Sequence, residues 1–296
     1  MANQRQIKRR ISASKNISQI TKAMEMVSAS KMKRAQEQAL AARPYTRALQ
    51  ASLQKVSKDV NPNIHPLLQQ HWQGRPLLLL ISTDKGLVGG LNNHLFKDTF
   101  DWMKQHKDAL VVAVGKKAVQ FCHLAGYEIH AQFTELPEKL TSSDIAPITT
   151  LLTTGFLDKS FMSVTVIYMD FVNTLSQKVR SIQLLPLQQA HDEVEEAETN
   201  KKESNLTPKL NIEYMFEPSA AEILGDLLPY YVENTLYQAF LEARASEHSS
   251  RMVAMKNASE NASDLVKELK LAYNKTRQAS ITNELLDITT ASMTVN

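Results

Sequence analysis

Residues 219–289 read SAAEILGDLLPYYVENTLYQAFLEARASEHSSRMVAMKNASENASDLVKELKLAYNKTRQASITNELLDIT, a stretch that predicts one very long helix. Ser219 is suited to cap its first turn, and Glu222 three residues later can complete a capping box. No glycine follows Gly225 here, and the one proline is Pro229, so we expect a kink but no break. About 70 residues at 1.5 Å each would make a helix of roughly 105 Å, far longer than a compact globule requires.

Small and apolar residues recur in this helix at alternating steps of three and four, the spacing of a coiled-coil seam. Asn234 and Gln238 interrupt the seam with polar groups, which in a coiled coil can fix the register. The predicted seam residues are Ile223, Leu227, Tyr230, Leu241, Ala245, His248, Met252, Met255, Ala262, Leu265, Leu269 and Ala272. We therefore expect His248 to be a packed residue rather than a metal ligand.

The start of the chain supplies a partner for this helix, over about residues 3–57. Residues 1–58 carry 13 Lys/Arg and 2 Asp/Glu, whereas residues 219–296 carry 7 and 10, so the two charges are opposite. The helices stand at opposite ends of the chain, so they can pair antiparallel, with roughly 20–25 Å of the longer one projecting. The predicted inner face of the first helix is Ile7, Ile11, Ile17, Ile20, Met24, Val27, Met32 and Ala35.

Between the helices the pattern changes to short strands alternating with helices, after a breaker-rich linker at 61–66. This pattern predicts a mainly parallel sheet with a hairpin at one edge. The expected strands are 77–82, 109–114, 127–133, 164–171 and 179–184, and the expected helices are 93–105, 116–125 and 148–157. The acidic stretch 190–209 is expected to be a loop.

The fold class is therefore α/β, with a long antiparallel two-helix coiled coil and an inserted Rossmann-like α/β domain. The predicted domains are the N-terminal helix at 1–58, the α/β domain at 70–212 and the C-terminal helix at 213–296. The composition is 43% hydrophobic, yet no apolar run approaches the ~20 residues of a membrane span. The first 20 residues are basic and free of acid, as in a transit peptide, but the helical pattern continues through them, so we expect no removed presequence.

Catalytic motifs are weak throughout. Gly86, Gly89 and Gly90 resemble a phosphate-binding loop, but they lack both the Walker ending and the Rossmann spacing, so we expect a tight turn. No histidine pair has metal-ligand spacing, and the single cysteine, Cys122, is expected to be a small buried residue. We therefore expect no catalytic residues, no metal and no cofactor.

Two other classes of function remain open on composition alone. The basic first helix could bind nucleic acid through phosphate neutralisation or act as a coiled-coil scaffold. Tyr45 is its one aromatic residue, however, and an acidic helix is available to pair with it. A nucleotide-dependent enzyme in the α/β domain is the second alternative.

Five blocks of sequence resemble the gamma subunit of F-type ATP synthase, in order and over nearly the whole chain. They are 20–32 (ITKAMEMVSASKM), 82–92 (STDKGLVGGLN), 246–248 (SEH), 251–258 (RMVAMKNA) and 274–285 (NKTRQASITNEL). One departure is the tail at 288–293, which reads ITTASM where the family has a run of small residues.

The resemblance implies a central rotor stalk that couples ion-driven rotation to ATP chemistry without itself catalysing it. The implied partners are three alpha and three beta subunits, the epsilon subunit and the membrane c-ring. The implied location is the cytoplasmic face of the bacterial inner membrane, as a peripheral protein. It also implies that Arg277 and Gln278 contact a beta subunit, with Thr282, Glu284 and Asp287 in the same coupling region. Met24 and Arg251 match positions that face beta.

Overall fold

The computed structural model describes residues 4–58, 65–187 and 219–294. The two predicted long helices are confirmed as α1 (Gln4–Lys58) and α6 (Ala220–Thr294), and α6 continues through Pro229. The predicted acidic loop and the first four residues of the predicted linker lie outside the described residues. In the described part no helix has an apolar stretch of the length that a bilayer crossing requires.

The chain forms two compact units. The unit called here the paired-helix unit comprises residues 1–31, 87–89 and 248–296. The unit called here the sheet unit comprises residues 32–86 and 90–247. Both long helices therefore contribute to both units, and the predicted domain boundaries stay predictions.

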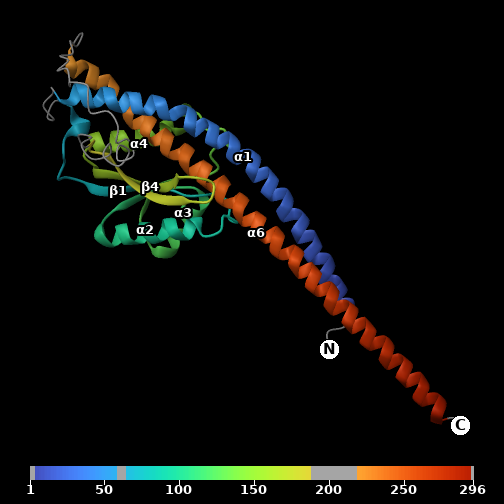
Figure 1. Ribbon diagram of the computed structural model, residues 1–296. Coiled ribbons are helices and arrows are strands. Elements are labelled where there is room, and N and C mark those ends of the chain that lie inside the picture. Colours follow the sequence, from blue (N-terminus) through green and yellow to red (C-terminus); the bar gives the residue numbers. More distant parts are fainter. Residues whose placement is uncertain (1–3, 59–64, 188–218, 295–296) are drawn as a thin grey trace, which may run out of the picture. The chain divides into compact units, whose positions relative to one another are not determined.

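The sheet unit is built on five strands in the order β3-β2-β1-β4-β5 (Figure 1). The strands are β1 (Arg75–Ile81), β2 (Leu110–Val114), β3 (Ile129–Phe133), β4 (Phe161–Phe171) and β5 (Gln177–Leu185). The pairs β1–β2, β1–β4 and β2–β3 are parallel, and β4–β5 is antiparallel. The predicted parallel sheet with an edge hairpin is confirmed. Strands β1 and β2 are almost entirely apolar because both faces of the sheet are covered.

Helices α2 and α3 lie on one face of the sheet and α4 on the other (Figure 1). Their bounds are α2 (Leu91–Gln105), α3 (Lys116–Ala125) and α4 (Ser142–Leu157), and a short 3-10 helix, η2, covers Pro66–Leu68. Helix α4 begins six residues before its predicted start because Thr141 and Asp144 form a capping box ahead of Pro147.

The first part of α6 belongs to the hydrophobic core of the sheet unit. Its buried residues recur every four positions and share one cluster with the sheet and α4; they are Leu224, Leu228, Val232, Leu236 and Phe240. This row is the face that the predicted seam omitted. Tyr230, which the seam included, is instead 47% exposed. A helix that packs on both a sheet and a second helix needs two buried faces, and a single coiled-coil pattern finds only one of them.

The opposite face of this part of α6 meets α1, within the same unit. Asn234 Nδ2 donates to Thr46 Oγ1 at 2.9 Å, and Gln238 Nε2 lies 3.5 Å from the carbonyl oxygen of Ala39. The ring of Tyr45 packs edge-on against Tyr230, with 5.9 Å between centroids. As residue numbers rise along α1 they fall along α6, so the pairing is antiparallel here. The two predicted polar interruptions are thus polar contacts between the helices.

Candidate functional site

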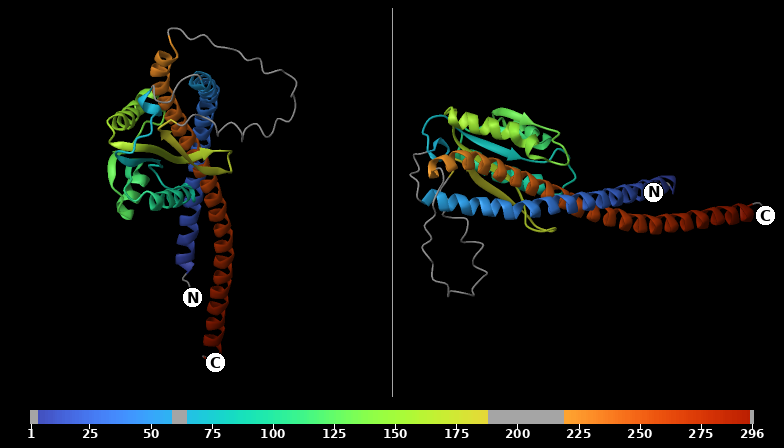
Figure 2. Two further views of the ribbon diagram at one scale, coloured as in Figure 1. Left: turned by 90° about the vertical axis from the view of Figure 1, so that its left-hand side faces the viewer. Right: turned by 90° about the horizontal axis from the view of Figure 1, so that it is seen from above.

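In the paired-helix unit, the start of α1 lies antiparallel to the last part of α6 (Figures 1 and 2). The buried positions of α1 recur every seven residues, at Ile7, Ser14, Thr21 and Ser28. The buried positions of α6 in this part include Met255, Ser259 and Ala262. The contact is therefore a heptad seam, as predicted, but small and hydroxyl-bearing side chains form much of it.

The predicted apolar inner face of α1 is partly wrong. Ile17, Ile20 and Val27 are 52%, 60% and 55% exposed. The prediction followed the large apolar side chains, whereas the positions in phase with Ile7 carry hydroxyls. Leu265 and Ala272 on α6 are likewise exposed rather than in the seam. Only small side chains at the contact let two helix backbones come close, because interaxial distance depends on the side chains between them.

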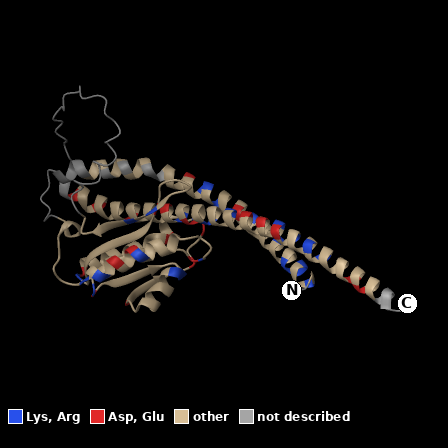
Figure 3. Ribbon diagram, turned by 60° about the horizontal axis from the view of Figure 1, so that its bottom comes forward, with Lys and Arg blue, Asp and Glu red and all other residues tan. Residues whose placement is uncertain are grey.

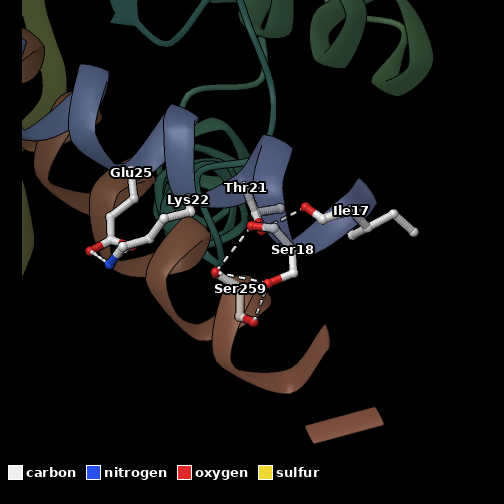
Figure 4. Close-up of polar contacts among 6 residues, drawn as sticks. All are labelled: Ile17, Ser18, Thr21, Lys22, Glu25 and Ser259. Atoms are coloured by element: carbon white, nitrogen blue, oxygen red, sulfur yellow. Dashed lines mark hydrogen bonds and ion pairs between the residues drawn. The ribbon is translucent and has the colours of Figure 1, made fainter. Parts of the chain in front are cut away.

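The outward-facing apolar residues of α1 form a stripe that includes a predicted site residue. Ile17, Ile20, Met24 and Val27 follow one another at steps of three, four and three, so they share one helix face. Met24 itself is half-buried. Lys22 and Glu25 form an ion pair of 3.0 Å beside the stripe (Figure 4). Exposed apolar stripes with polar borders are typical of protein–protein contacts.

Basic residues accompany this stripe. Residues 4–31 carry seven Lys/Arg and one Glu, and the cations lie along this part of α1 (Figure 3). Charges of one sign on a helix surface steer oppositely charged partners and raise their association rate.

Arg251, the second predicted contact on this part of the coiled coil, is only 9% exposed. Arg251 also interacts with another residue of the chain. Arg251 is therefore largely enclosed by its own chain.

The last turns of α6 extend beyond the described part of α1. Ser18 lies opposite Ser259, so Gln4 in an antiparallel pair lies opposite about residue 273. About 20 residues of α6, roughly 30 Å, therefore have no α1 partner within the described residues. The helix continues through the unusual 288–293 tail to Thr294, where the Thr289 hydroxyl donates to the Leu286 carbonyl at 2.9 Å.

All five predicted contact residues of the C-terminal region lie in this segment, called here the tip (residues 274–294). They are Arg277, Gln278, Thr282, Glu284 and Asp287, and all are exposed. The Thr282 hydroxyl donates to the Gln278 carbonyl at 3.0 Å, and Ser280 Oγ donates to Glu284 Oε1 at 3.4 Å. The polar groups of the other tip residues face solvent, where a partner chain could contact them.

The tip also carries apolar residues that the sequence interpretation missed. Ile281, Leu285 and Ile288 are exposed and follow at steps of four and three, with Leu286 beside them. Their spacing was a usable signal, because an apolar helical face that nothing in the described residues covers predicts a partner for that face.

The other place to look for a site is the carboxyl end of the parallel strands, where open α/β sheets bind ligands. A small cavity lies there in the sheet unit, lined by strand-end residues such as Ser82, Val114 and Phe133. Gly115, at φ +89°, permits the close approach of the β2 end, because a Cβ there would lie 2.6 Å from the Ser82 carbonyl oxygen.

Helix α6 closes this cavity with Phe240, Ala243, Arg244 and Glu247. Arg244 Nη2 donates to the Leu136 carbonyl at 3.0 Å, and Arg244 Nη1 lies 3.6 Å from Glu247 Oε2. The remaining volume is about 20 Å³, which is enough for a water molecule and far too small for a nucleotide.

The predicted glycine turn follows β1 in the chain. Of its three glycines only Gly89 has a left-handed backbone, at φ +57°, and Leu87 adopts a similar φ of 62°. In the paired-helix unit the Ser250 hydroxyl donates to the Val88 carbonyl at 2.6 Å, so the turn packs on α6. Cys122 is fully buried on α3, as predicted, and burial raises its pKa to about 11, which suppresses thiolate chemistry at neutral pH.

These observations define a class of protein: two long helices paired antiparallel, one of them anchored in an α/β sheet and ending in an exposed tip that has no helical partner among the described residues. The family model described as ATP synthase matches residues 3–295. A gamma chain of ATP synthase from Glaesserella parasuis is 39% identical over 97% of this chain and 98% of that relative. The gamma chain from Opitutus terrae is 40% identical over 98% of both. The chain belongs to the ATP synthase gamma chain family.

Solved structures agree with this assignment. The central stalk and c-ring structure of Tetrahymena thermophila mitochondrial ATP synthase contains a chain that is 25% identical, with a TM-score of 0.59 over 81% of this chain and 99% of that chain. A chain of the Euglena gracilis mitochondrial enzyme, at 19% identity, shares the fold with a TM-score of 0.69 over 99% of this chain and 94% of that one. Nothing in these similarities supports the nucleic-acid-binding alternative.

Proposed function

We propose that the chain is the rotating central stalk that couples ion-driven rotation of a membrane c-ring to ATP chemistry on alpha and beta subunits. The observation that carries the proposal is the division of α6. One uninterrupted helix is fixed in the sheet core by Leu224 to Phe240, and it ends in a tip with exposed polar and apolar residues and no described partner in the chain.

The coupling mechanism follows from symmetry. One gamma chain inside a ring of three alpha and three beta subunits cannot make the same contacts with all three beta subunits. Each beta subunit is therefore biased toward a different conformation, by no more than the difference in contact free energy. Rotation of the chain moves these biases around the ring. Free energy passes between rotation and ATP chemistry without any reaction on the gamma chain itself.

The proposed contact residues are those of the tip and of the α1 stripe. Arg277 and Gln278 would meet a beta subunit directly, and Thr282, Glu284 and Asp287 would complete the same region. Met24 would act within the exposed apolar stripe. Arg251, being buried, would act by holding α6 in shape. The exposure of all five tip residues supports these roles.

The chain is proposed to be non-catalytic, because α6 fills the crevice in which this kind of sheet binds ligands and leaves about 20 Å³. The epsilon subunit and the c-ring are proposed to bind the sheet unit. The chain would then be a peripheral protein on the cytoplasmic face of a bacterial inner membrane.

Reconstitution tests this proposal. The full-length chain alone should not hydrolyse ATP, whereas its addition to purified alpha and beta subunits should give a co-purifying complex with raised, cooperative turnover. The matched control is the same complex carrying an Arg277→Ala/Gln278→Ala chain. Robust turnover by the isolated chain, or failure to co-purify with alpha and beta, would contradict the proposal.

A further inference from the structure

The block 82–92, STDKGLVGGLN, follows β1, and the proposed function gives its polar residues no part. Two of them have a clear structural use. Ser82 Oγ accepts a hydrogen bond from the Ala118 amide at 2.7 Å, and Asp84 Oδ1 accepts one from the Lys116 amide at 3.0 Å. These two side chains therefore hold the first turn of α3 at the end of β1.

Asn92, which ends the block in the first turn of α2, is only half used in this way. Its Nδ2 donates to Thr83 Oγ1 at 2.9 Å, but its Oδ1 is buried and accepts a hydrogen bond from no described residue. Turning the amide over supplies no donor, because the Thr83 hydroxyl gives its one proton to the Lys85 carbonyl at 2.9 Å. Buried amide oxygens nearly always accept a hydrogen bond, either from the protein or from ordered water. Asn92 Oδ1 therefore requires a donor that the described residues do not supply.

A cavity of suitable size lies next to Asn92. This residue lines the cavity at the carboxyl ends of β1 and β2, called here the strand-end cavity, whose volume is about 20 Å³. A water molecule requires a cavity of about 10–15 Å³ and two to four polar partners. The strand-end cavity is therefore large enough for one water molecule.

The charged groups around the strand-end cavity favour a neutral occupant. Arg244 and Glu247 of α6 line it together with Asp84. A cation would lie near the guanidinium, and an anion would lie near the two carboxyl groups, so the cavity favours neither sign of charge. A water molecule is neutral, and it can both donate to an oxygen and accept from a nitrogen.

Arg244 can supply the second partner of such a water molecule. Its guanidinium has five N–H groups. Nη2 donates to the Leu136 carbonyl at 3.0 Å, whereas Nη1 lies 3.6 Å from Glu247 Oε2, beyond the usual length of a hydrogen bond. The guanidinium therefore has donors left for an acceptor in the cavity.

We propose that one water molecule occupies the strand-end cavity, where it donates to Asn92 Oδ1 and accepts from the Arg244 guanidinium. The water would join the first turn of α2 to α6 inside the sheet unit. The end of the block 82–92 would then be a structural hydration site. The proposal concerns this unit alone and does not rest on the proposed function.

A crystal structure of the full-length chain, in a map that shows ordered water, tests the proposal directly. A water peak should lie about 2.7–3.2 Å from Asn92 Oδ1 and from a nitrogen of Arg244. A map that shows other buried waters but no peak at Asn92 Oδ1 would overturn the proposal. A peak that reaches Asn92 but not Arg244 would also overturn it, because the link between α2 and α6 would be missing.

A substitution then tests the role of the Asn92 oxygen. Asn92→Leu replaces the amide with an apolar side chain of similar size, so the water peak should be lost. Thr99→Val is the matched control on the same helix, because it removes a buried hydroxyl that bonds the Leu95 carbonyl at 2.8 Å, and it should leave the peak in place. A peak that persists in Asn92→Leu would contradict the proposal.

A measurement in solution requires no variant to fold. In the native full-length chain, nuclear magnetic resonance should show cross-relaxation between water and the side-chain amide protons of Asn92, with the sign of a bound water molecule. Cross-relaxation with the opposite sign, or none, would show that the cavity holds no bound water and would overturn the proposal.

Discussion

The two parts of α6 have the same secondary structure and opposite surroundings. Residues 220–247 present a row of large apolar side chains, ending at Phe240, to the core of the sheet unit. Residues 248–294 present to α1 a narrow seam in which Met255 is followed by the small side chains Ser259 and Ala262, and then no described surface of the chain at all. The difference indicates that the first part contributes most to the stability of the fold, whereas the second part carries the residues for which we propose contacts with other chains.

The physical basis of this division is the amount of apolar surface that each part of α6 buries within the chain. Burial of a large apolar side chain contributes about 1.5–3 kcal/mol to folding, and the first part of α6 buries one on nearly every turn. The tip leaves its large apolar residues in solvent, where they contribute nothing to the folding of this chain. Their contribution is available to an interface instead.

Truncation of the core row should have the largest effect on stability. Phe240→Ala should lower the free energy of unfolding of the sheet unit by about 3–5 kcal/mol, because it leaves a cavity under a fully buried ring. Leu285→Ala in the tip, matched as an exposed apolar truncation, should change it by less than about 0.5 kcal/mol. Denaturant unfolding followed by circular dichroism measures both changes. Equal losses of unfolding free energy in the two variants would contradict the distinction between the two parts of α6.

The first part of α6 should also make the stability of the chain depend on pH. Glu242 is 5% exposed, and it accepts hydrogen bonds from Gln238 Nε2 at 2.8 Å and from the Tyr168 hydroxyl at 3.0 Å. Burial is the main cause that raises the pKa of Glu242, and the neighbouring Asp170 carboxyl raises it further. A raised pKa in the folded state means that stability is full at low pH and is lost as pH rises through the folded value.

Glu242→Gln should remove this loss, because the amide does not ionise. The unfolding free energy of the native chain relative to Glu242→Gln should therefore fall as pH rises. Glu260→Gln, an exposed carboxyl on the second part of α6, is the matched control for the loss of one charge. A parallel pH profile for native and Glu242→Gln chains would show that the buried carboxyl does not titrate in this range.

The smallest expected effects come from substitutions that change helix propensity in the two parts of α6. Gly225 has an ordinary helical backbone, and a Cβ there would meet nothing within 4 Å. Gly225→Ala should therefore stabilise the sheet unit by about 0.4–1 kcal/mol. Ala279→Gly in the tip should reduce local helicity while leaving the main unfolding transition in place. Hydrogen exchange distinguishes the global effect of Gly225→Ala from the local effect of Ala279→Gly. A shift of the global unfolding transition by Ala279→Gly would show that the tip does not unfold independently of the rest of the chain.

The sequence was sufficient to predict the two long helices, the five strands and the edge hairpin, because each has a strong period or sharp breakers. The seam of α1 was not predictable in the same way. Ile17, Ile20 and Val27 satisfy a three-and-four spacing as well as the true seam does, and hydrophobicity favoured them. Burial of Ser14, Thr21 and Ser28 depends on how closely α6 approaches, which no local pattern encodes.

The candidate contact residues show a similar limit. Arg277 to Asp287 were placed on a projecting helix because the C-terminal helix was predicted to be the longer one, and their exposure agrees with that expectation. Their roles came from resemblance to a family, and they stay proposals. The burial of Arg251 could not be foreseen, because a long cation at a heptad position can point outward or fold along the helix.

The division of α6 is tested most directly by melting and activity measured on the same variants. Arg277→Ala/Gln278→Ala should leave the melting temperature nearly unchanged and lower ATPase turnover or ion-driven synthesis in the assembled complex, since a lost charge-assisted contact costs about 1.5–3 kcal/mol. Leu236→Ala should lower the melting temperature and the assembly yield instead. Full activity in the tip variant, or an equal loss of melting temperature in both variants, would contradict the account.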